Sequence, residues 1–505
     1  MSRGLLRNSL SNLMAGVIPA IATLLTVPVV IGKLGAVQYG IFVLLTSVVG
    51  YFSMLDINVS AGSMKYLAEY HARSEHRRAS EVVTCGVLIY LIIGLVGAVS
   101  LFGSAAWVLS RFFDVPEELR ANTVHALQVG AVAFLFGQLQ AYLNSVPQAL
   151  LRYDISGRYE SIFGVLVSLG TMAVVLAGGG LVEIMAARLA LSVMNCGLLV
   201  AAIRRLMPQL AWRLPPRAMV GAVLSFSGYA YLNRVAGVTY QNTDTLIIGA
   251  LSDMRAVALF SVPFLLANRV FGMVYRLGHV LFPLASALAS QGKQEQLRAT
   301  YLLATRYLVY LNACLCVMLC MLSREILHYW AGHEFGPPAA LVLTLVAAAV
   351  FMDSLTNLPS LVNDGLGKPR NTGVFALARA ALGVGLLLVL VDRYGFIGAA
   401  WGQLLTSSVM SIAFLIYIHG RTVPVSLLTT VRVAYLPALL VLTLFLPIVL
   451  LRTGATPASL AVSAALIFAV STVLALVGWR WVLRDEARAM VLARLSPRRS
   501  NKLVC

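Results

Sequence analysis

Long apolar runs follow one another along almost the whole chain, and they constrain its fold more than any other feature. They fall near residues 12–32, 37–57, 82–108, 123–147, 161–178, 181–203, 219–242, 255–278, 299–323, 337–362, 373–391, 397–418, 433–451 and 458–480. A helix needs roughly 20 apolar residues to cross a bilayer, and it satisfies its own backbone polar groups there. The runs therefore predict an all-α integral membrane protein of about 14 transmembrane helices.

Charge is scarce for a chain of this length. Of the 505 residues, 59% are hydrophobic and only 11% are charged, whereas a soluble domain needs many more charged side chains to cover its surface. In a soluble protein, the formal net charge of +18 would suggest a nucleic-acid partner. Here the basic residues flank the apolar runs instead of forming one patch, so we expect membrane lipids around the chain and no nucleic acid.

Lysine and arginine are distributed unevenly between the two ends of the apolar runs. If the N-terminus is cytoplasmic, the cytoplasmic segments carry about four times as many basic residues as the opposite ones. The opposite segments hold Lys33, Arg111, Arg120, Arg255, Arg324, Arg393 and Arg452. Because cytoplasmic loops carry the excess of positive charge, we expect both termini to be cytoplasmic.

A weak internal repeat divides the chain. Ile31-Gly32-Lys33-Leu34 follows the first apolar run, and Ile248-Gly249-Ala250-Leu251 follows the seventh, 217 residues later. This spacing equals six helices, an even number that preserves orientation, so the halves should be parallel repeats. We expect two six-helix lobes around a central cavity, followed by two additional helices and a basic cytoplasmic tail. The predicted boundaries are 1–210, 211–422, 423–482 and 483–505.

No motif of an enzyme or of a cofactor site occurs in the sequence. It contains no G-x-x-x-x-G-K-[ST] loop, no H-E-x-x-H and no G-x-S-x-G. Cys314, Cys316 and Cys320 share one apolar run, without histidine or carboxylate at metal-ligand spacing. We therefore expect no catalytic residue, no metal, no cofactor and no enzymatic activity.

Arginines within the apolar runs point to a function, because a charge at the bilayer centre costs at least about 2.5–3.5 kcal/mol. They outnumber the acids there, which suits an anionic substrate. We expect Arg234, Arg269 and Arg379 to face the cavity and contact the substrate. Arg306 is a further substrate-binding candidate, although for Arg306 and Arg188 snorkelling or a helix-end pair is an equal alternative.

Three acids near or inside the runs are candidates for ion coupling. They are Asp56, Asp244 and Asp353. Asp244 lies near the outer end of its predicted helix, where a structural cap or an ion pair is an equal alternative.

Amide side chains form two polar stripes at helical spacing. Gln140 and Asn144 lie on one face of the fourth predicted helix, and Asp353 and Asn357 lie on one face of the tenth. The offset of 217 takes Gln140 to Asn357, so the stripes fall on equivalent helices. We expect these amides and Asn268 to contact substrate, although such residues also join helices by hydrogen bonds.

Short sequence patterns lie at the ends of the predicted helices. Leu34-Gly35-Ala36-Val37-Gln38-Tyr39-Gly40 follows the first helix, and it resembles the L-G-x-x-x-Y-G of the polysaccharide (O-antigen type) flippases. Asp244-Thr245-Leu246-Ile247-Ile248-Gly249 resembles their D-x-x-x-I-G in the seventh, and Leu281-Phe282-Pro283 resembles the L-F-P that ends the eighth. Further matches follow the family's order, at Asp56 with 64–70, at 366–370 and at 395–400. Ile57-Asn58 and Leu251-Ser252 depart from the usual Leu-Gly.

This resemblance implies the multidrug/oligosaccharidyl-lipid/polysaccharide transporter superfamily. Its flippases turn over an undecaprenyl-pyrophosphate-linked oligosaccharide from the cytoplasmic to the periplasmic leaflet of the bacterial inner membrane. They work by alternating access, coupled to an ion gradient, and serve cell-surface polysaccharide such as O-antigen, lipopolysaccharide or exopolysaccharide. The resemblance thus implies a lipid-linked oligosaccharide substrate, with a polysaccharide polymerase and chain-length proteins as further partners.

Three rival functions stay open. A multidrug cation antiporter of the same fold would need an acid-rich cavity, whereas arginines outnumber acids within the apolar runs of this sequence. A peptidoglycan-precursor flippase is hard to distinguish by sequence. A membrane glycosyltransferase or polymerase would carry a large outer loop, and the longest here is near 109–122.

Overall fold

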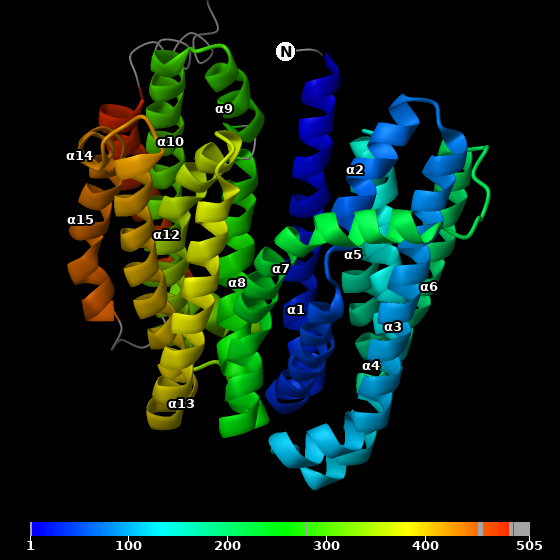
Figure 1. The fold of residues 1–505 in the computed structure, drawn as a ribbon. Coiled ribbons are helices and arrows are strands. Elements are labelled where there is room, and N and C mark those ends of the chain that lie inside the picture. The colour runs from blue at the N-terminus through cyan, green and yellow to red at the C-terminus, as the bar shows by residue number, and fades with distance from the viewer. Residues whose placement is uncertain (1–2, 279–280, 453–457, 484–487, 489–505) are drawn as a thin grey trace, which may run out of the picture.

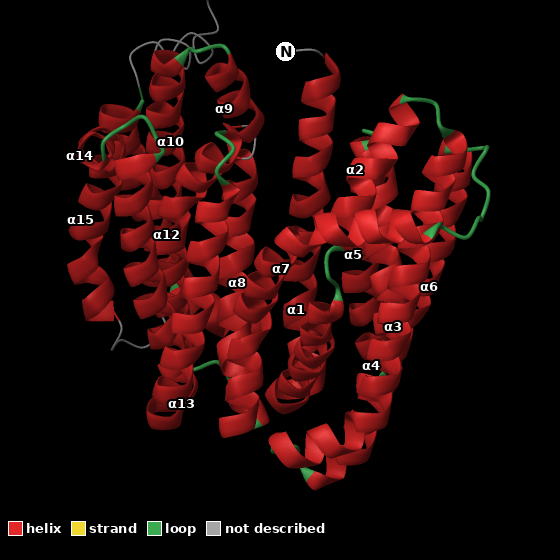
Figure 2. Cartoon of the chain, viewed as in Figure 1, coloured by secondary structure: helices red, strands yellow, loops and turns green. Residues whose placement is uncertain are grey.

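The computed structural model of the protein describes residues 3–278, 281–452, 458–483 and 488. Within these ranges the chain is helical apart from its turns and one isolated bridge between Asp114 and Asp253 (Figure 2). The all-α prediction is therefore confirmed. The structure shows two groups of helices, which we call the N-lobe and the C-lobe (Figure 1).

The N-lobe consists of α1 to α6. Their bounds are Arg3–Tyr51, Val59–Ala72, His76–Phe112, Glu117–Ala149, Tyr153–Leu176 and Leu181–Leu206, with the short η1 at Phe52–Leu55. The C-lobe consists of α7 to α13. Their bounds are Arg217–Leu251, Met254–Gly278, Leu281–Ser290, Gln294–Met321, Ser323–Ile326, Pro337–Gly365 and Pro369–Arg421, with η2 at Leu327–Ala331. The chain continues through α14 (Leu427–Thr430), η3 (Val431–Tyr435), α15 (Leu436–Arg452), α16 (Leu460–Val477) and η4 (Gly478–Val482).

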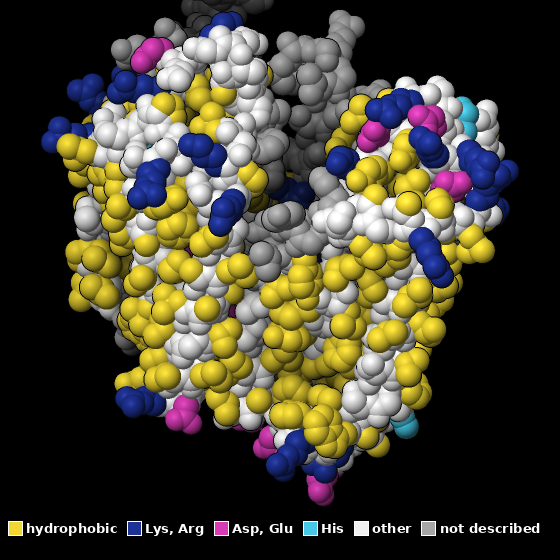
Figure 3. All heavy atoms as spheres, in the orientation of Figure 1, with side chains coloured by type: hydrophobic (Ala, Val, Ile, Leu, Met, Phe, Trp, Pro, Cys, Tyr) yellow, Lys and Arg dark blue, Asp and Glu magenta, His cyan; other side chains and the backbone are white. Residues whose placement is uncertain are grey.

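Eleven of the described helices are long and apolar enough to cross a membrane. Two of them, α1 and α13, contain a sharp kink, at Gly35 and Gly395. The helix α13 covers two of the predicted apolar runs, and α1 covers one run and most of the next. The helix α7 is also long, although it is not among the eleven. The helices are thus compatible with about 14 crossings. Figure 3 shows a broad hydrophobic band across the visible face of the molecule, with many of the lysines and arginines of that face above it, toward α2 and α9.

Residues with positive φ occur at corresponding turns of the two lobes, close to the predicted offset of 217 residues. Gly178 between α5 and α6 has φ +84°, and Gly395 in the kink of α13 has φ +58°. Leu151 and Gly367 also have positive φ, before α5 and before α13. A third pair, Ser74 and Gly292, precedes α3 and α10. The two lobes therefore turn at equivalent points, as parallel repeats should.

The lobes pack together at the end of the molecule opposite α2 and α9. Residues of α1 such as Tyr39 and Leu44 share one buried hydrophobic cluster with Val257 and Phe260 of α8. A Cβ atom on Gly40 would lie 1.8 Å from the carbonyl oxygen of Met254, so α1 and α8 approach as closely as glycine allows. Toward α2 and α9 the two groups of helices diverge, with the first part of α1 between them (Figure 1).

Two prolines each leave one carbonyl group without a hydrogen-bond donor in its own helix, and side chains from other elements donate to these carbonyls. Pro28 has no N–H for the carbonyl of Leu24, and the indole Nε1 of Trp330 in the C-lobe donates to that oxygen at 2.9 Å. Pro359 likewise releases the carbonyl of Leu355, to which the Tyr435 hydroxyl donates at 3.2 Å. The first bond joins the lobes, and the second joins η3 to α12.

Candidate functional site

Each lobe contains a cavity at mid-length of its helices. The N-lobe cavity, of about 580 Å³, lies between α1, α4, α5 and α6, with α8 of the other lobe on one side. The C-lobe cavity, of about 330 Å³, lies between α7, α12 and α13. Since α7 is the repeat of the first part of α1, α12 of α4, and α13 of α5 and α6, the two cavities occupy equivalent positions.

The N-lobe cavity carries two arginines that have no ion pair with a carboxylate in the described part of the chain. They are Arg188 from α6 and Arg269 from α8. The guanidinium of Arg188 lies 4.7 Å from the ring centroid of Phe42, a cation–π contact that leaves its N–H groups available. Glu160 lines the same cavity.

Amide groups in the N-lobe cavity are also unsatisfied. Gln140, Asn144 and Asn195 line it, and the Oδ1 atoms of Asn144 and Asn195 are buried without a hydrogen-bond partner among the described residues, as is Arg188 Nε. Buried polar groups normally find a partner. The two amide oxygens can accept from water or from hydroxyl groups, whereas the arginine N–H groups can donate to an anion.

Basic side chains continue from this cavity between the lobes. Arg276, two turns after Arg269 on α8, interacts electrostatically with both Arg269 and Glu160. A Cβ atom on Gly16 of α1 would lie 1.8 Å from the Arg276 guanidinium. The guanidinium thus rests against α1, on the side of the cavity that faces α2 and α9.

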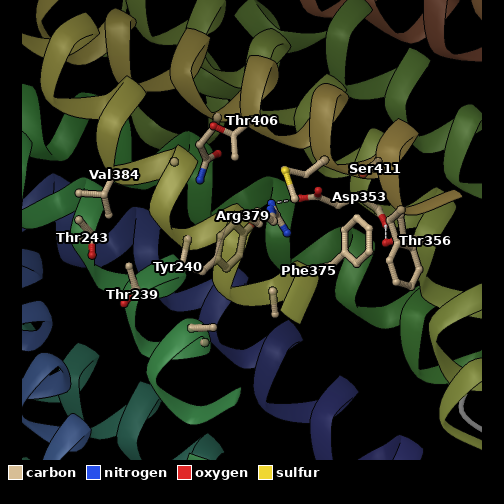
Figure 4. A pocket seen from close by; sticks show the side chains of 18 of the residues that line it. Thr239, Tyr240, Thr243, Asp353, Thr356, Phe375, Arg379, Val384, Thr406 and Ser411 are labelled. Atoms are coloured by element: carbon tan, nitrogen blue, oxygen red, sulfur yellow. Dashed lines mark hydrogen bonds and ion pairs between the residues drawn. The ribbon is translucent and has the colours of Figure 1, made fainter. Parts of the chain in front are cut away.

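The C-lobe cavity has an internal ion pair at its centre. Arg379 Nη2 donates to Asp353 Oδ2 at 2.5 Å and to Ser407 Oγ at 3.1 Å, and its guanidinium lies 4.5 Å from the Tyr240 ring centroid. Figure 4 shows Arg379 and Asp353 pointing toward each other across the cavity, with Tyr240 beside them. The pair leaves the centre of this cavity without net charge.

One end of the C-lobe cavity is rich in oxygen atoms. Gln403 Nε2 donates to Asp244 Oδ2 at 2.7 Å. The atoms Gln403 Oε1, Thr243 Oγ1 and Thr406 Oγ1 are buried there, with no hydrogen-bond partner in the ranges that the structure describes. A carboxylate, an amide oxygen and two hydroxyls are the ligands that a hard cation prefers, and the carboxylate could instead take a proton.

Replacing Arg379 with alanine should lower the free energy of unfolding by about 3–5 kcal/mol, because it strands the Asp353 carboxylate in the cavity. Thermal unfolding of the purified protein, followed by tryptophan fluorescence, measures this loss as a lower Tm. The double variant Arg379→Ala/Asp353→Asn should recover most of the Tm. Equal Tm values for the single and double variants would contradict an ion pair between these residues.

The other predicted residues lie elsewhere. Asp56 is buried beside α2, where it accepts from the Asn58 amide at 2.8 Å and pairs with Arg234 at 3.8 Å. Arg306 lies on the opposite side of the C-lobe, where it donates to the Trp481 carbonyl. Neither Asp56, Arg234 nor Arg306 lines either of the two cavities.

Two predicted amides also line neither cavity. Asn268 Nδ2 donates to the Phe264 carbonyl at 2.9 Å, one turn earlier in α8. Asn357 faces a narrow pocket between α8, α10 and α12 instead of the C-lobe cavity. Four residues exceed one helical turn, so a stripe with this spacing drifts around the helix, and Asn357 leaves the face that carries Asp353.

Sequence reasoning left out several residues that line the cavities. Asn195 lies seven residues after Arg188, two turns along the same face of α6, and this spacing from an arginine already considered could have identified it. No sequence pattern singles out Gln403, Thr243 and Thr406 as cavity residues, because single amides and hydroxyls are common in apolar runs.

Comparisons with known proteins agree with this architecture. The sequence profile of the family described as "Polysaccharide biosynthesis protein" matches residues 34–340. The chain is 22% identical to the "Uncharacterized membrane protein EpsK" of Bacillus subtilis, over 68% of this chain and 70% of that protein. It is 22% identical to the "Probable flippase AglR" of Haloferax volcanii, over 76% of this chain and 77% of that one. Among solved structures, the lipid II flippase MurJ in an inward closed conformation is similar, with TM-score 0.66 and 12% identity over 95% of this chain and 99% of MurJ.

Proposed function

The chain belongs to the family of polysaccharide biosynthesis proteins, and from that premise we propose that it is a flippase for an undecaprenyl-pyrophosphate-linked oligosaccharide. It is a multi-pass membrane protein, and in our proposal it lies in a bacterial inner membrane with both termini cytoplasmic. The substrate moves from the cytoplasmic to the periplasmic leaflet and enters cell-surface polysaccharide synthesis. A polymerase and chain-length proteins would then receive the translocated glycan.

The observation that carries this proposal is the positive charge of the N-lobe cavity. The guanidiniums of Arg188 and Arg269 face it without carboxylate ion pairs among the described residues, beside unsatisfied amides. Carrying a pyrophosphate through hydrocarbon requires a hydrated path and groups that neutralise its charge. Arginine binds phosphate oxygens bidentately. Arg188, Arg269, Gln140 and Asn144 would therefore bind the pyrophosphate end of the substrate.

Alternating access fits the way the lobes pack. They share a hydrophobic cluster at the end opposite α2 and α9, which would close the periplasmic side. The α2/α9 end carries most of the basic loop residues and would be cytoplasmic. Substrate would then enter from the cytoplasmic leaflet, past Arg276, while its polyprenyl chain stays in the lipid.

The coupling ion would bind near Asp244, because its carboxylate is held by an amide, whereas Asp353 and Asp56 each pair with an arginine. Replacing Asp244 with asparagine should abolish the dependence of transport on an imposed sodium or proton gradient, with at least tenfold slower driven transport. Transport into proteoliposomes, measured with and without each gradient, tests this. A variant that still responds fully to the gradient would exclude Asp244.

The activity itself can be measured by the sidedness of a labelled lipid-linked oligosaccharide in proteoliposomes. A membrane-impermeant oxidant destroys sugars in the outer leaflet only. The purified protein should expose the inner-leaflet half of the substrate within minutes, whereas empty liposomes should not. Failure to do so, together with efflux of organic cations or flipping of a peptidoglycan precursor, would favour the rival transporters of the same fold. Release of free or elongated glycan would instead indicate an enzyme.

A further inference from the structure

The end of the C-lobe cavity nearest α2 and α9 differs from the rest of the cavity. Phe375, Thr356 and Ser411 lie at this end, and Thr239, Thr243 and Val384 lie at the other (Figure 4). This end of the cavity lies close to the turn between α12 and α13, because Thr356 lies two turns before the end of α12 and Phe375 lies two turns after the start of α13. That helix-to-helix turn touches α9, where the Ser286 hydroxyl donates to the Gly365 carbonyl at 2.6 Å.

One wall of this end is aromatic. The ring of Phe375 packs edge-on against Phe414, with centroids 5.2 Å apart and planes at 78°. It also packs against Tyr417, with centroids 5.3 Å apart and planes tilted by 51°. Phe414 is buried, whereas Phe375 is only partly buried and lines the cavity. Its neighbours thus hold the ring in one orientation, with a surface turned to the cavity.

Hydroxyl groups lie around this aromatic wall. Thr356, Ser360 and Ser411 line the same end, and the Thr356 hydroxyl already donates to the Asp353 carbonyl at 2.8 Å. Its oxygen therefore presents lone pairs to the cavity. Ser411 has only 3% of its surface exposed, so its hydroxyl faces the cavity or its walls and not bulk solvent.

We propose that this end of the C-lobe cavity binds one uncharged sugar residue of the substrate glycan, an assignment that rests on the proposed function. A pyranose has an apolar face of C–H groups, which packs on an aromatic ring, and a rim of hydroxyls, which exchange hydrogen bonds with serine and threonine. Phe375 supplies the ring, and Thr356, Ser360 and Ser411 supply the rim. The hydroxyl of a sugar can also donate to the Asp353 carboxylate beside them.

The balance of charge excludes the other parts of the substrate from this subsite. Arg379 is neutralised by Asp353 next to this subsite, so the subsite offers no free cation to a pyrophosphate, and the Asp353 carboxylate is not free for a cationic drug. The other carboxylate of the cavity, Asp244, lies with Thr243 at the opposite end. The equivalent N-lobe cavity has the opposite character, with Arg188 and Arg269 unpaired by carboxylates among the described residues. The repeated fold thus provides one cavity for the charged linkage and one for the neutral sugar.

Saturation-transfer NMR on the full chain in nanodiscs tests the subsite. The probes are the neutral methyl glycosides of glucose, galactose, mannose, rhamnose and N-acetylglucosamine. At least one should receive saturation from the wild-type protein, and the signal should fall at least fivefold in Phe375→Ala and in Ser411→Val. The matched control is Val374→Ala. Val374 is the neighbour of Phe375 in α13, but it does not line the cavity and 57% of its surface is exposed.

The outcomes separate the subsite from the proposed function. Loss of the signal in Phe375→Ala but not in Val374→Ala, with wild-type unfolding temperature, supports the subsite. No signal for any glycoside, or a signal that these substitutions leave unchanged, overturns it, even if the protein flips lipid-linked oligosaccharide. Specific glycoside binding without flipping would keep the subsite and overturn the flippase.

Discussion

Replacing Arg188 with glutamine should reduce translocation of the lipid-linked oligosaccharide by about 10- to 100-fold. The substitution keeps a polar side chain but removes the charge that lies over Phe42 in the N-lobe cavity. A hydrogen bond to a charged group contributes about 1.5–3 kcal/mol, which corresponds to this range of rates. The leaflet-sidedness assay measures the rate directly, and Arg188→Lys should keep part of it, because lysine retains the charge but not the bidentate geometry.

An arginine outside the cavities provides the control for this experiment. Arg120 lies at the start of α4, with 43% of its side chain exposed, and neither cavity includes it. Arg120→Gln changes the net charge equally and should translocate at the wild-type rate. If Arg188→Gln and Arg120→Gln were equally active at equal protein levels, the N-lobe cavity would not bind the pyrophosphate.

Replacing Trp330 with phenylalanine should shift the protein toward states in which the lobes separate at the end opposite α2 and α9. The indole satisfies the Leu24 carbonyl that Pro28 leaves free, and a buried orphan acceptor costs about 1–3 kcal/mol. One factor of ten in the equilibrium corresponds to about 1.4 kcal/mol. Spin labels at Ser110 and Arg393, exposed at this end of the two lobes, should therefore show a larger population at long distance in double electron–electron resonance.

The proline itself tests the cause of that shift. Pro28→Ala gives residue 28 an N–H, so the Leu24 carbonyl gains a partner within its own helix. In that background Trp330→Phe should have little further effect on the distance distribution. If the substitution shifted the distances equally in both backgrounds, packing of the indole, and not its hydrogen bond, would hold the lobes together.

The helices could be predicted from the sequence because their apolar runs are long and the loops between them are short. The runs 12–32 and 37–57 lie in α1 on either side of Gly35, although 37–57 continues past α1 through η1, and the runs 373–391 and 397–418 flank Gly395 in α13. In the structure, Gly178 and Gly395 occupy equivalent turns at the repeat offset of 217 residues. The helix predictions depend on local apolar patterns, which a single sequence contains.

The partners of the buried charges could not be predicted in the same way. Asp56 and Arg234 are far apart in the chain, and nothing in their sequence surroundings indicates that the turn before α2 pairs with α7. Arg379 and Asp353 were both expected at a cavity, but their pairing depends on how α12 packs on α13. Arg306 and Arg188 have the same sequence context, an arginine in an apolar run, yet one contacts the end of η4 and the other lines the N-lobe cavity.

The bond between Tyr435 and the released carbonyl of Leu355 has a mechanical consequence. It fastens the C-terminal helices to the middle of α12, and the Tyr310 hydroxyl adds a second attachment by donating to the Leu474 carbonyl of α16 at 2.5 Å. These two bonds should make the C-terminal helices move together with the C-lobe. In the proposed alternating-access cycle, a fluorophore attached to the lipid-facing side of α16 would therefore report the rotation of the C-lobe from a position outside both cavities.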